Sequence, residues 1–238
     1  MSESTFHFKQ FSIDQDNCAM KVGTDGVLLG AWTDTQNANK ILDAGCGTGL
    51  IALMVAQKSN AQIDAIDIDQ GAIEQAGKNF YKSPWNDRIK TDHISLQTKA
   101  LDLELTYDLI ICNPPFFHNA LKPENEARAK ARHSSLLPFS DLINSTFQLL
   151  NASGRLSLII PFNDADSLID LATSKGFYLK RFCKIIPKPN KNPKRVLVEF
   201  SKSKIDLPKA SELIIENEKR HHYTSEYILL TKNYYLNF

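Results

Sequence analysis

The tetrapeptide Asn113-Pro114-Pro115-Phe116 contains residue types that can hold a planar amine. It directly follows the apolar run 107–112, which is typical of a buried strand. The two prolines restrict the backbone, so the side-chain oxygen of Asn113 and the carbonyl oxygen of Pro114 become fixed acceptors. Together they can accept both hydrogens of an exocyclic amine while Phe116 stacks on the attached base. We expect these four residues to be catalytic by positioning an amine, and an ordinary turn is the alternative.

A second candidate is the glycine-rich loop 43–49, Asp-Ala-Gly-Cys-Gly-Thr-Gly, between an apolar strand and an apolar helix. Its G-x-G-x-G spacing differs from the G-x-G-x-x-G of dinucleotide-binding folds, and the Gly-Lys-Ser/Thr of a P-loop is missing. The acid two positions before the first glycine would repel a pyrophosphate but attract an ammonium group. S-adenosylmethionine carries both an ammonium and a sulfonium group. The loop therefore predicts this cofactor, bound by Asp43, Gly45, Gly47 and Gly49, and a turn without a ligand is the alternative.

An acidic residue also ends the next predicted strand, 63–67, about twenty residues beyond the loop. From that position Asp67 can accept both hydroxyl groups of a ribose, and Ile68 can lie against one face of adenine. Asp67 and Asp69 can instead cap the helix that begins near Ala72. We favour ribose binding for Asp67 and helix capping for Asp69.

Short apolar runs alternate with segments of helical period from Lys40 onward, which indicates βαβ units around a mainly parallel sheet. The predicted strands are 41–43, 63–67, 89–94, 107–112 and 155–160, and the predicted helices are 50–56, 72–80, 139–150 and 164–175. Two further strands, 177–186 and 195–200, are joined by a proline-rich segment that favours a hairpin. The predicted fold class is α/β, with a mainly parallel seven-stranded sheet, an antiparallel C-terminal hairpin and helices on both faces.

We expect one domain over residues 1–238. Residues 1–38 do not follow the βα alternation and are predicted to form an N-terminal cap over the sheet. Residues 39–174 are predicted to form the cofactor-binding core with the catalytic loop. Residues 175–238 are predicted to form the basic C-terminal strands and a final helix.

The composition is that of an ordinary globular protein, with 42% hydrophobic and 23% charged residues. It excludes a disordered, collagenous or coiled-coil chain. The four cysteines are widely spaced, which favours a reduced compartment and argues against a zinc site. No apolar run is long enough to cross a bilayer and the first residues have no apolar signal region, so we expect a cytoplasmic protein without a membrane partner or a metal.

The net charge of +1 conceals a strongly uneven distribution. Residues 175–204 contain ten Lys or Arg and one acid, a net charge of +9 that leaves −8 for the rest of the chain. A second basic stretch follows the Asn-Pro-Pro-Phe segment. Both stretches predict contacts with an RNA backbone, and a solvated basic loop is the alternative. The candidate RNA-binding residues are Lys122, Arg128, Lys130, Arg132, Lys188, Lys191, Lys194 and Arg195.

The order of the glycine loop, the acid that ends the second strand and Asn-Pro-Pro-Phe resembles the class I S-adenosylmethionine-dependent amino-methyltransferases, which have a Rossmann-like fold. More narrowly, the chain is similar from end to end to the bacterial family that methylates adenine N6 in tRNA1(Val). The most specific matches are in the N-terminal region, and others are spread over the chain. They are residues 8–11, 18–26, 28–32, 83–85, 88–89, 195–197 and 223–236.

This resemblance implies methylation of adenosine 37, just after the anticodon, with S-adenosylmethionine as cofactor. It implies that Thr24 and Asp25 close the methionine end of the cofactor, in addition to the loop and strand-end residues above. Family members carry an acid after the third strand that contacts the cofactor adenine. Ser95 occupies the matching position here, so this resemblance implies that Ser95 and the following Leu96 bind the cofactor, with Asp92, three residues earlier, as the alternative adenine contact.

The residues alone leave other functions open. The same motifs allow methylation of guanine N2 in rRNA or of a glutamine amide in a protein, and the basic segments disfavour only the protein substrate. A non-catalytic RNA-binding protein on the same fold is a further alternative. We expect tRNA as the partner and a monomeric protein.

Overall fold

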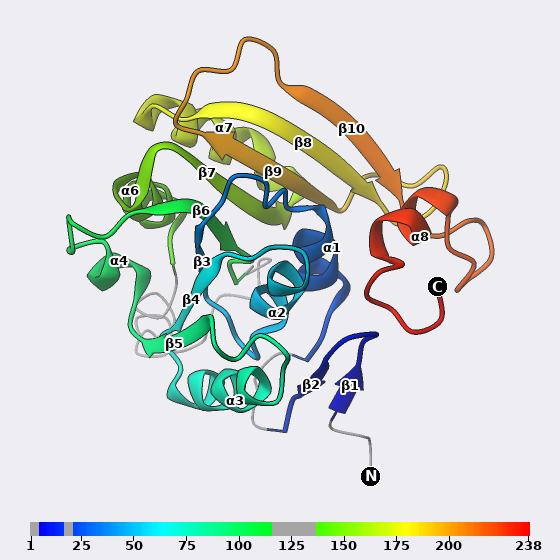
Figure 1. The fold of residues 1–238 in the computed structure, drawn as a ribbon. Helices are drawn as coiled ribbons and strands as arrows, with labels where there is room; N and C mark the ends of the chain where they lie inside the picture. The colour runs from blue at the N-terminus through cyan, green and yellow to red at the C-terminus, as the bar shows by residue number, and fades with distance from the viewer. Residues whose placement is uncertain (1–4, 17–20, 116–136) are drawn as a thin grey trace, which may run out of the picture.

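The computed structural model describes residues 5–16, 21–115 and 137–238, and its centre is an eight-stranded sheet (Figure 1). The strand order is β10-β8-β9-β7-β6-β3-β4-β5. Strands β5, β4, β3, β6 and β7 run parallel, and β9 is antiparallel to both β7 and β8. The bounds are β3 Lys40–Ala44, β4 Gln62–Asp67, β5 Ile89–His93, β6 Tyr107–Cys112, β7 Leu150–Pro161, β8 Tyr178–Ile186, β9 Arg195–Ser201 and β10 Lys209–Ile214.

The predicted fold class and the seven predicted strands are confirmed, and the sheet contains one strand more. The additional strand β10 pairs in parallel with β8 and forms the edge of the sheet. Its first four residues are exposed and only Leu213 is buried. An edge strand with so little buried surface lacks the apolar alternation by which a strand is predicted.

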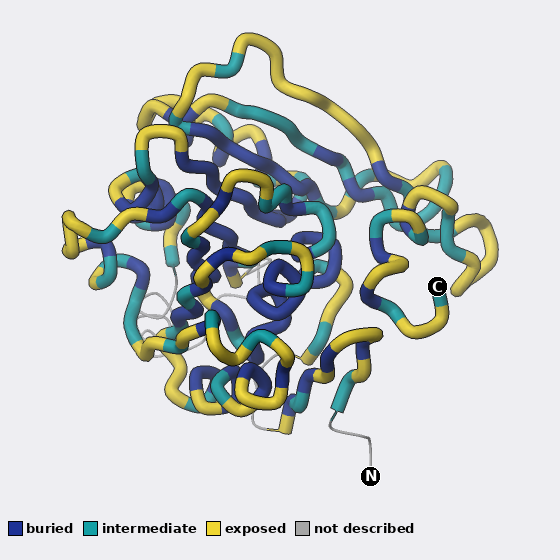
Figure 2. The backbone as a smooth tube through the Cα atoms, viewed as in Figure 1, coloured by how far each residue is buried: buried dark blue, intermediate teal, exposed yellow. Residues whose placement is uncertain are grey.

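Helices cover both faces of the sheet. One face carries α1 (Thr24–Trp32), α2 (Leu50–Gln57), α3 (Gln70–Tyr81) and α8 (Ser225–Thr231), and the other carries α4 (Leu96–Lys99), α6 (Phe139–Leu149), α7 (Ala165–Lys175) and the 3-10 turn η1 (Phe162–Asp164). The central strands are apolar on both sides. Their side chains therefore alternate between two buried clusters, and the buried backbone in Figure 2 is concentrated in these strands and in α2. Within the described ranges, no helix combines the length and apolarity needed to cross a membrane.

The turn of a short hairpin formed by β1 (Thr5–His7) and β2 (Ser12–Asp14) contacts the C-terminal residues. The backbone N–H of Lys9 donates to the carbonyl of Tyr234 at 2.8 Å. The backbone N–H of Asp14 donates to the side chain of Asn79 on α3 at 3.0 Å. Helix α1, which follows the hairpin, packs on α2 with Val27 and Leu29 fully buried.

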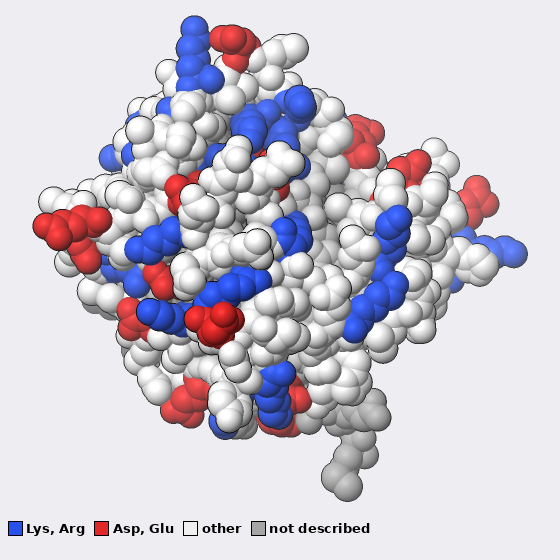
Figure 3. Space-filling model, in the orientation of Figure 1, with Lys and Arg blue, Asp and Glu red and all other residues white. Residues whose placement is uncertain are grey.

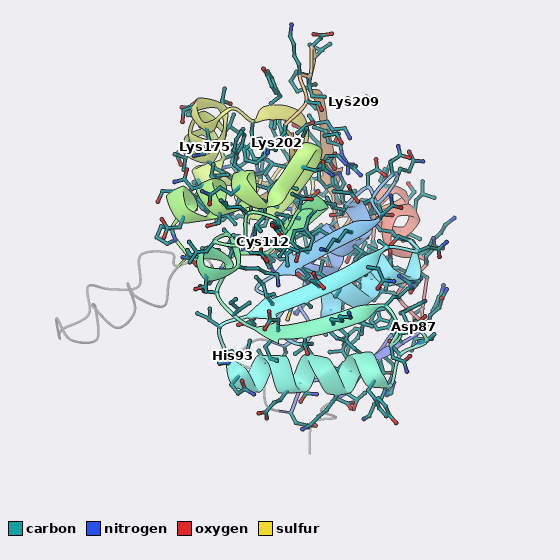
Figure 4. The ribbon with its side chains drawn as sticks, turned by 60° about the vertical axis from the view of Figure 1, so that its left-hand side comes forward. Asp87, His93, Cys112, Lys175, Lys202 and Lys209 are labelled. Carbon is teal, nitrogen blue, oxygen red and sulfur yellow. The ribbon has the colours of Figure 1, made fainter. Side chains whose placement is uncertain are left out.

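Parallel strands place their carboxyl ends on one edge of the sheet, and this edge collects the candidate site residues. Figure 4 labels His93, the last residue of β5, toward the left of the view and Cys112, the last residue of β6, near its middle. Asp87, two residues before β5, lies toward the right. The chain order reverses between β3 and β6, and ligands bind at the carboxyl ends of an open α/β sheet beside such a point.

Candidate functional site

Asp43 precedes the glycine loop and is fully buried at the end of β3. Its Oδ2 atom accepts the backbone N–H of Ala52 in the first turn of α2 at 3.0 Å. Its Oδ1 atom is buried and has no hydrogen-bond partner among the described residues. Burial, reinforced by the nearby carboxylate of Asp67, raises the pKa of Asp43 to about 7 despite the bond from Ala52. Asp43 therefore carries one unsatisfied acceptor, although it is not among the lining residues of the two pockets described below.

The three loop glycines have different roles. Gly45 and Gly47 have φ values of 76° and 54°, and a Cβ atom at either position would meet nothing within 4 Å. The space beside these two residues is therefore open for a ligand to approach the backbone. Gly49 has a φ of 84°, but a Cβ atom there would overlap the ring of Phe80. Gly49 is thus required by packing against α3, although we predicted cofactor contact for all three.

The two acidic residues at the end of β4 make different contacts, and ribose binding by Asp67 stays a prediction. The Oδ2 atom of Asp67 accepts the N–H of Gly47 at 2.9 Å, which ties the strand end to the glycine loop. Asp69 caps α3 by accepting the N–H of Ala72 at 2.9 Å, as predicted. Ile68 lies between them with 55% of its surface exposed, although it is apolar. An exposed apolar side chain beside a carboxylate suits contact with a base and its ribose.

Asn113 emerges from the end of β6. Its Oδ1 atom is buried and accepts no hydrogen bond within the described part of the chain. Pro114 is buried and Pro115 is exposed. Phe116, the fourth predicted catalytic residue, lies outside the described residues. A buried amide oxygen without a partner is unfavourable unless a ligand supplies a donor, which makes Asn113 a candidate binding position.

Two pockets meet at these residues. The first has a volume of about 280 Å³ and the second of about 520 Å³. Both pockets share a wall formed by Gly45, Gly47, Asn113, Pro114 and Pro115. The first is also lined by Asp67, Ile68, Ile94, Leu96, Gln97 and Leu137, and the second by Lys21, Thr24, Asp25, Thr48, Leu50 and Arg195.

An ion pair closes one side of the second pocket. The Nε atom of Arg195, the first residue of β9, lies 2.8 Å from Oδ2 of Asp25 in the first turn of α1. We predicted Asp25 for the cofactor and Arg195 for RNA, and the structure brings both to the same pocket wall.

Comparisons with known proteins identify the family. The model of the methyltransferase small domain matches residues 20–163. The chain is 45% identical to the tRNA1(Val) (adenine(37)-N6)-methyltransferase of Parabacteroides distasonis over 99% of both chains. It is 48% identical to the enzyme of that name from Flavobacterium psychrophilum, over 97% of this chain and 99% of the relative. The chain belongs to the tRNA1(Val) (adenine(37)-N6)-methyltransferase family.

Solved structures agree on the fold of this family member. A predicted O-methyltransferase from Agrobacterium tumefaciens matches 88% of this chain and 96% of its own with a TM-score of 0.68 at 20% identity. A ribosomal protein L11 methylase from Lactobacillus delbrueckii subsp. bulgaricus matches 84% of this chain and 100% of its own with a TM-score of 0.58 at 15% identity. At such identities the similarity establishes the methyltransferase fold alone.

Ser95 occupies the position where the methyltransferase family was expected to carry an acid, and its side chain caps α4. The hydroxyl oxygen of Ser95 accepts the backbone N–H of Thr98 at 3.1 Å, and it lies 2.8 Å from the hydroxyl oxygen of Thr98. Ser95 is not among the described lining residues of either pocket, whereas its neighbour Leu96 lines the first. Gln97 also lines that pocket, and sequence reasoning missed it because no motif marks it. Its place just after β5 is the signal that could have identified it.

The basic segment 175–204 is partly neutralised within the fold. Glu199 is completely buried and lies 2.9 Å from Nζ of Lys180 and 2.8 Å from Arg181. Lys188 pairs with Glu216 at 3.4 Å.

Lys191 and Lys194 are exposed in the turn before β9, and within the described ranges their side chains form no ion pair. The local excess of positive charge is therefore smaller than the sequence count suggests, and Figure 3 shows acidic and basic side chains interspersed on the viewed face. The other predicted RNA-binding residues lie outside the described part of the chain. They are Lys122, Arg128, Lys130 and Arg132.

Proposed function

We propose that this chain transfers a methyl group from S-adenosylmethionine to the exocyclic N6 amine of adenosine 37 in tRNA1(Val). Its membership of a family whose relatives carry that activity in their names supports the substrate. The observation that carries the proposal is the buried Oδ1 atom of Asn113, which has no hydrogen-bond partner among the described residues and lies in the wall shared by the two pockets. An acceptor at this place can hold an amine of one ligand against the reactive group of another.

The described residues fit the cofactor in the first pocket and along the glycine loop. The Oδ1 atom of Asp43, which has no hydrogen-bond partner in the described part of the protein, would attract the ammonium group. The open space beside Gly45 and Gly47 would admit the aliphatic part of the cofactor that carries this group. The carboxylate of Asp67 has lone pairs left for the ribose hydroxyls. Ile68 would cover one face of the adenine. Thr24 and Asp25, in the second pocket, would enclose the methionine end.

The chemistry follows from how the chain holds the acceptor amine. When bound, S-adenosylmethionine supplies a methyl group made electrophilic by its sulfonium. Asn113 Oδ1 and the Pro114 carbonyl each accept one hydrogen of the target amine, which directs the nitrogen lone pair toward that methyl group. The methylated amine loses its extra proton to water. No side chain of the protein has to act as a base or a nucleophile.

The second pocket is the proposed site of the target adenine, because it is the larger and lies on the side that carries the basic residues. Lys21 lines it, Arg195 lines it while paired with Asp25, and the exposed Lys194 adjoins Arg195 in the sequence. These cations would attract the phosphates beside an extruded nucleotide, since enzymes that modify a base move it out of its stack. Lys191 would extend that contact along the backbone.

Methylation of separately transcribed tRNAs tests this proposal. The protein is incubated with labelled S-adenosylmethionine, and the product nucleosides are separated. We expect label in N6-methyladenosine from tRNA1(Val) and none in a transcript with adenosine 37 replaced by guanosine. Label on guanine of rRNA, on protein, or only on another tRNA would overturn the proposed substrate.

Replacement of Asn113 by Ala tests the proposed catalytic position. We expect methyl transfer to fall at least about a hundredfold, because the amine loses one of its two acceptors. The affinity for S-adenosylhomocysteine should stay within about threefold. Asn60→Ala, an exposed asparagine outside both pockets, is the matched control and should retain activity. A large loss of S-adenosylhomocysteine affinity in Asn113→Ala would assign Asn113 to the cofactor instead.

A further inference from the structure

Gln97 is a polar side chain at an otherwise apolar end of the first pocket. The neighbouring lining residues at that end are Ile94, Leu96 and Leu137. This end adjoins the acid after β4, because the backbone N–H of Ile94 donates to the carbonyl of Asp67 at 3.2 Å. A ligand that places a ribose at Asp67 would therefore reach Gln97 with the group attached to that ribose.

A carboxylate on another helix fixes the orientation of the Gln97 amide. The Nε2 atom of Gln97 donates to Oδ2 of Asp141, in the first turn of α6, at 3.3 Å. A carboxylate can only accept hydrogen bonds, so the NH₂ group of Gln97 must face Asp141 and the amide cannot be flipped. The Oε1 atom of Gln97 is consequently the atom left to meet a ligand in the pocket, and it can only accept.

The order of the strands gives the direction of the ligand. Strands β3, β4 and β5 are neighbours, and adjacent strands lie about 4.8 Å apart. A nucleoside cofactor held at the glycine loop after β3 and at Asp67 after β4 would place its base at the residues that follow β5. Gln97 belongs to those residues. The acceptor of Gln97 thus lies on the side where a purine base would present its edge.

We propose that Oε1 of Gln97 accepts a hydrogen from the exocyclic amine of the cofactor adenine, with Asp141 as the positioning residue. The inference rests on the proposed function for the identity of the cofactor. It makes Gln97 the residue that distinguishes adenine from hypoxanthine, which has a carbonyl oxygen in place of the amine. A free glutamine could turn its NH₂ group toward that carbonyl, and the bond to Asp141 prevents this rotation.

Two other candidates for the same contact are already engaged. Ser95, which occupies the position predicted from the sequence, caps α4 through Thr98. Asp92 lies 3.4 Å from Nζ of Lys99, and its side chain is 55% exposed. Neither lines the pocket among the described residues. Gln97 is therefore the better placed acceptor.

Calorimetric titration with S-adenosylhomocysteine and with S-inosylhomocysteine, its deaminated analogue, tests this inference without any methyl transfer. We expect the wild-type protein to prefer the adenosyl compound by about tenfold or more, because the inosyl compound leaves two acceptors facing each other. Gln97→Ala and the similarly sized Gln97→Met should reduce the preference to within about threefold by weakening adenosyl binding. Asp141→Asn should also reduce the adenosyl preference, but by strengthening inosyl binding, because the Gln97 amide can then flip.

Two variants provide controls. Gln70→Ala removes an exposed glutamine whose amide also donates to a carboxylate, that of Glu74 at 3.0 Å, and should keep the full preference. An unchanged preference in both Gln97 variants would overturn the inference, and so would a preference that Ser95→Ala abolishes. Absence of S-adenosylhomocysteine binding by the wild-type protein would instead refute the proposed function, and the inference would fail with it.

Discussion

The raised pKa of Asp43 makes cofactor affinity depend on pH. Burial is the main cause, and it brings the pKa from 3.8 to about 7. The ionised carboxylate attracts the ammonium group of the cofactor, and the protonated carboxyl group does not. With a pKa of about 7, the ionised fraction is about 9% at pH 6 and about 76% at pH 7.5. The affinity for S-adenosylhomocysteine should therefore rise about eightfold over this interval.

The same group affects stability in the opposite direction. The folded protein binds the Asp43 proton more tightly than the unfolded chain, so this group favours folding at low pH. That contribution is lost as the pH rises from about 4 through about 7. A shift of about three pKa units sets an upper value of about 4 kcal/mol. Asp43→Asn removes the charge and can still accept the N–H of Ala52, so it should melt at a higher temperature at pH 7.5 but bind at least about tenfold more weakly.

Isothermal titration at pH 6.0, 6.75 and 7.5, combined with thermal unfolding at each pH, measures both effects. A histidine ring also lies beside the first pocket, where that of His93 is 2.9 Å from the carbonyl of Ile68. His93→Gln is therefore the control and should retain the eightfold rise. A constant affinity in the wild-type protein, or a rise that persists in Asp43→Asn, would refute the reasoning.

Three further predictions concern buried charge, packing and RNA contact. Glu199→Gln removes a buried carboxylate from the partly buried cations Lys180 and Arg181, and it should lower the free energy of unfolding by about 3 to 5 kcal/mol in urea titrations. A loss below about 1 kcal/mol would contradict this. Gly49→Ala should lower the melting temperature by several degrees, because the added Cβ atom would overlap the ring of Phe80. An unchanged melting temperature would show that the Phe80 ring can move aside without cost. Replacing Lys191 and Lys194 by Gln should weaken tRNA binding and reduce its salt slope by about 1 to 2, and an unchanged slope would remove this turn from the RNA contact.

Paired residues elsewhere in the sheet provide matched controls. Lys188→Gln removes a cation that already pairs with Glu216, so it should change the salt slope less than the exposed lysines do. Glu212→Gln removes an exposed carboxylate that pairs with Lys184 at 3.2 Å, and it should change stability by less than about 1 kcal/mol.

The features that could be predicted from the sequence are local. The glycine loop, the acid at the end of β4 and the Asn-Pro-Pro segment each follow an apolar strand, and the carboxyl ends of parallel strands meet on one edge. Predicting the strands therefore predicted the neighbourhood of the site. Asp69 was assigned correctly as a helix cap for the same reason, since capping depends on residues only three apart.

The features that could not be predicted depend on contacts between distant segments. Gln97 meets Asp141 across 44 residues, and Arg195 meets Asp25 across 170. The periodicity of apolar residues along the sequence gives no information about such pairs of distant residues. The net charge of segment 175–204 overstates its free positive charge for the same reason. Counting residues in the segment could not show that Glu216 pairs with Lys188 and Asp25 with Arg195. Helix α1 was missed because it is apolar around its whole circumference and contains two glycines.

The wall formed by Gly45, Gly47 and the Asn113 loop has a consequence for inhibitor chemistry. It separates pockets of about 280 and 520 Å³ while bordering both. A bisubstrate compound, with one nucleoside-like half on each side and a short linker past the wall, occupies both pockets in a single binding event. Linking makes the second contact intramolecular, so the affinities of the two halves reinforce each other without any new contact with the protein. Outside the shared wall each half touches its own set of side chains, so these parts of the two halves can be optimised separately.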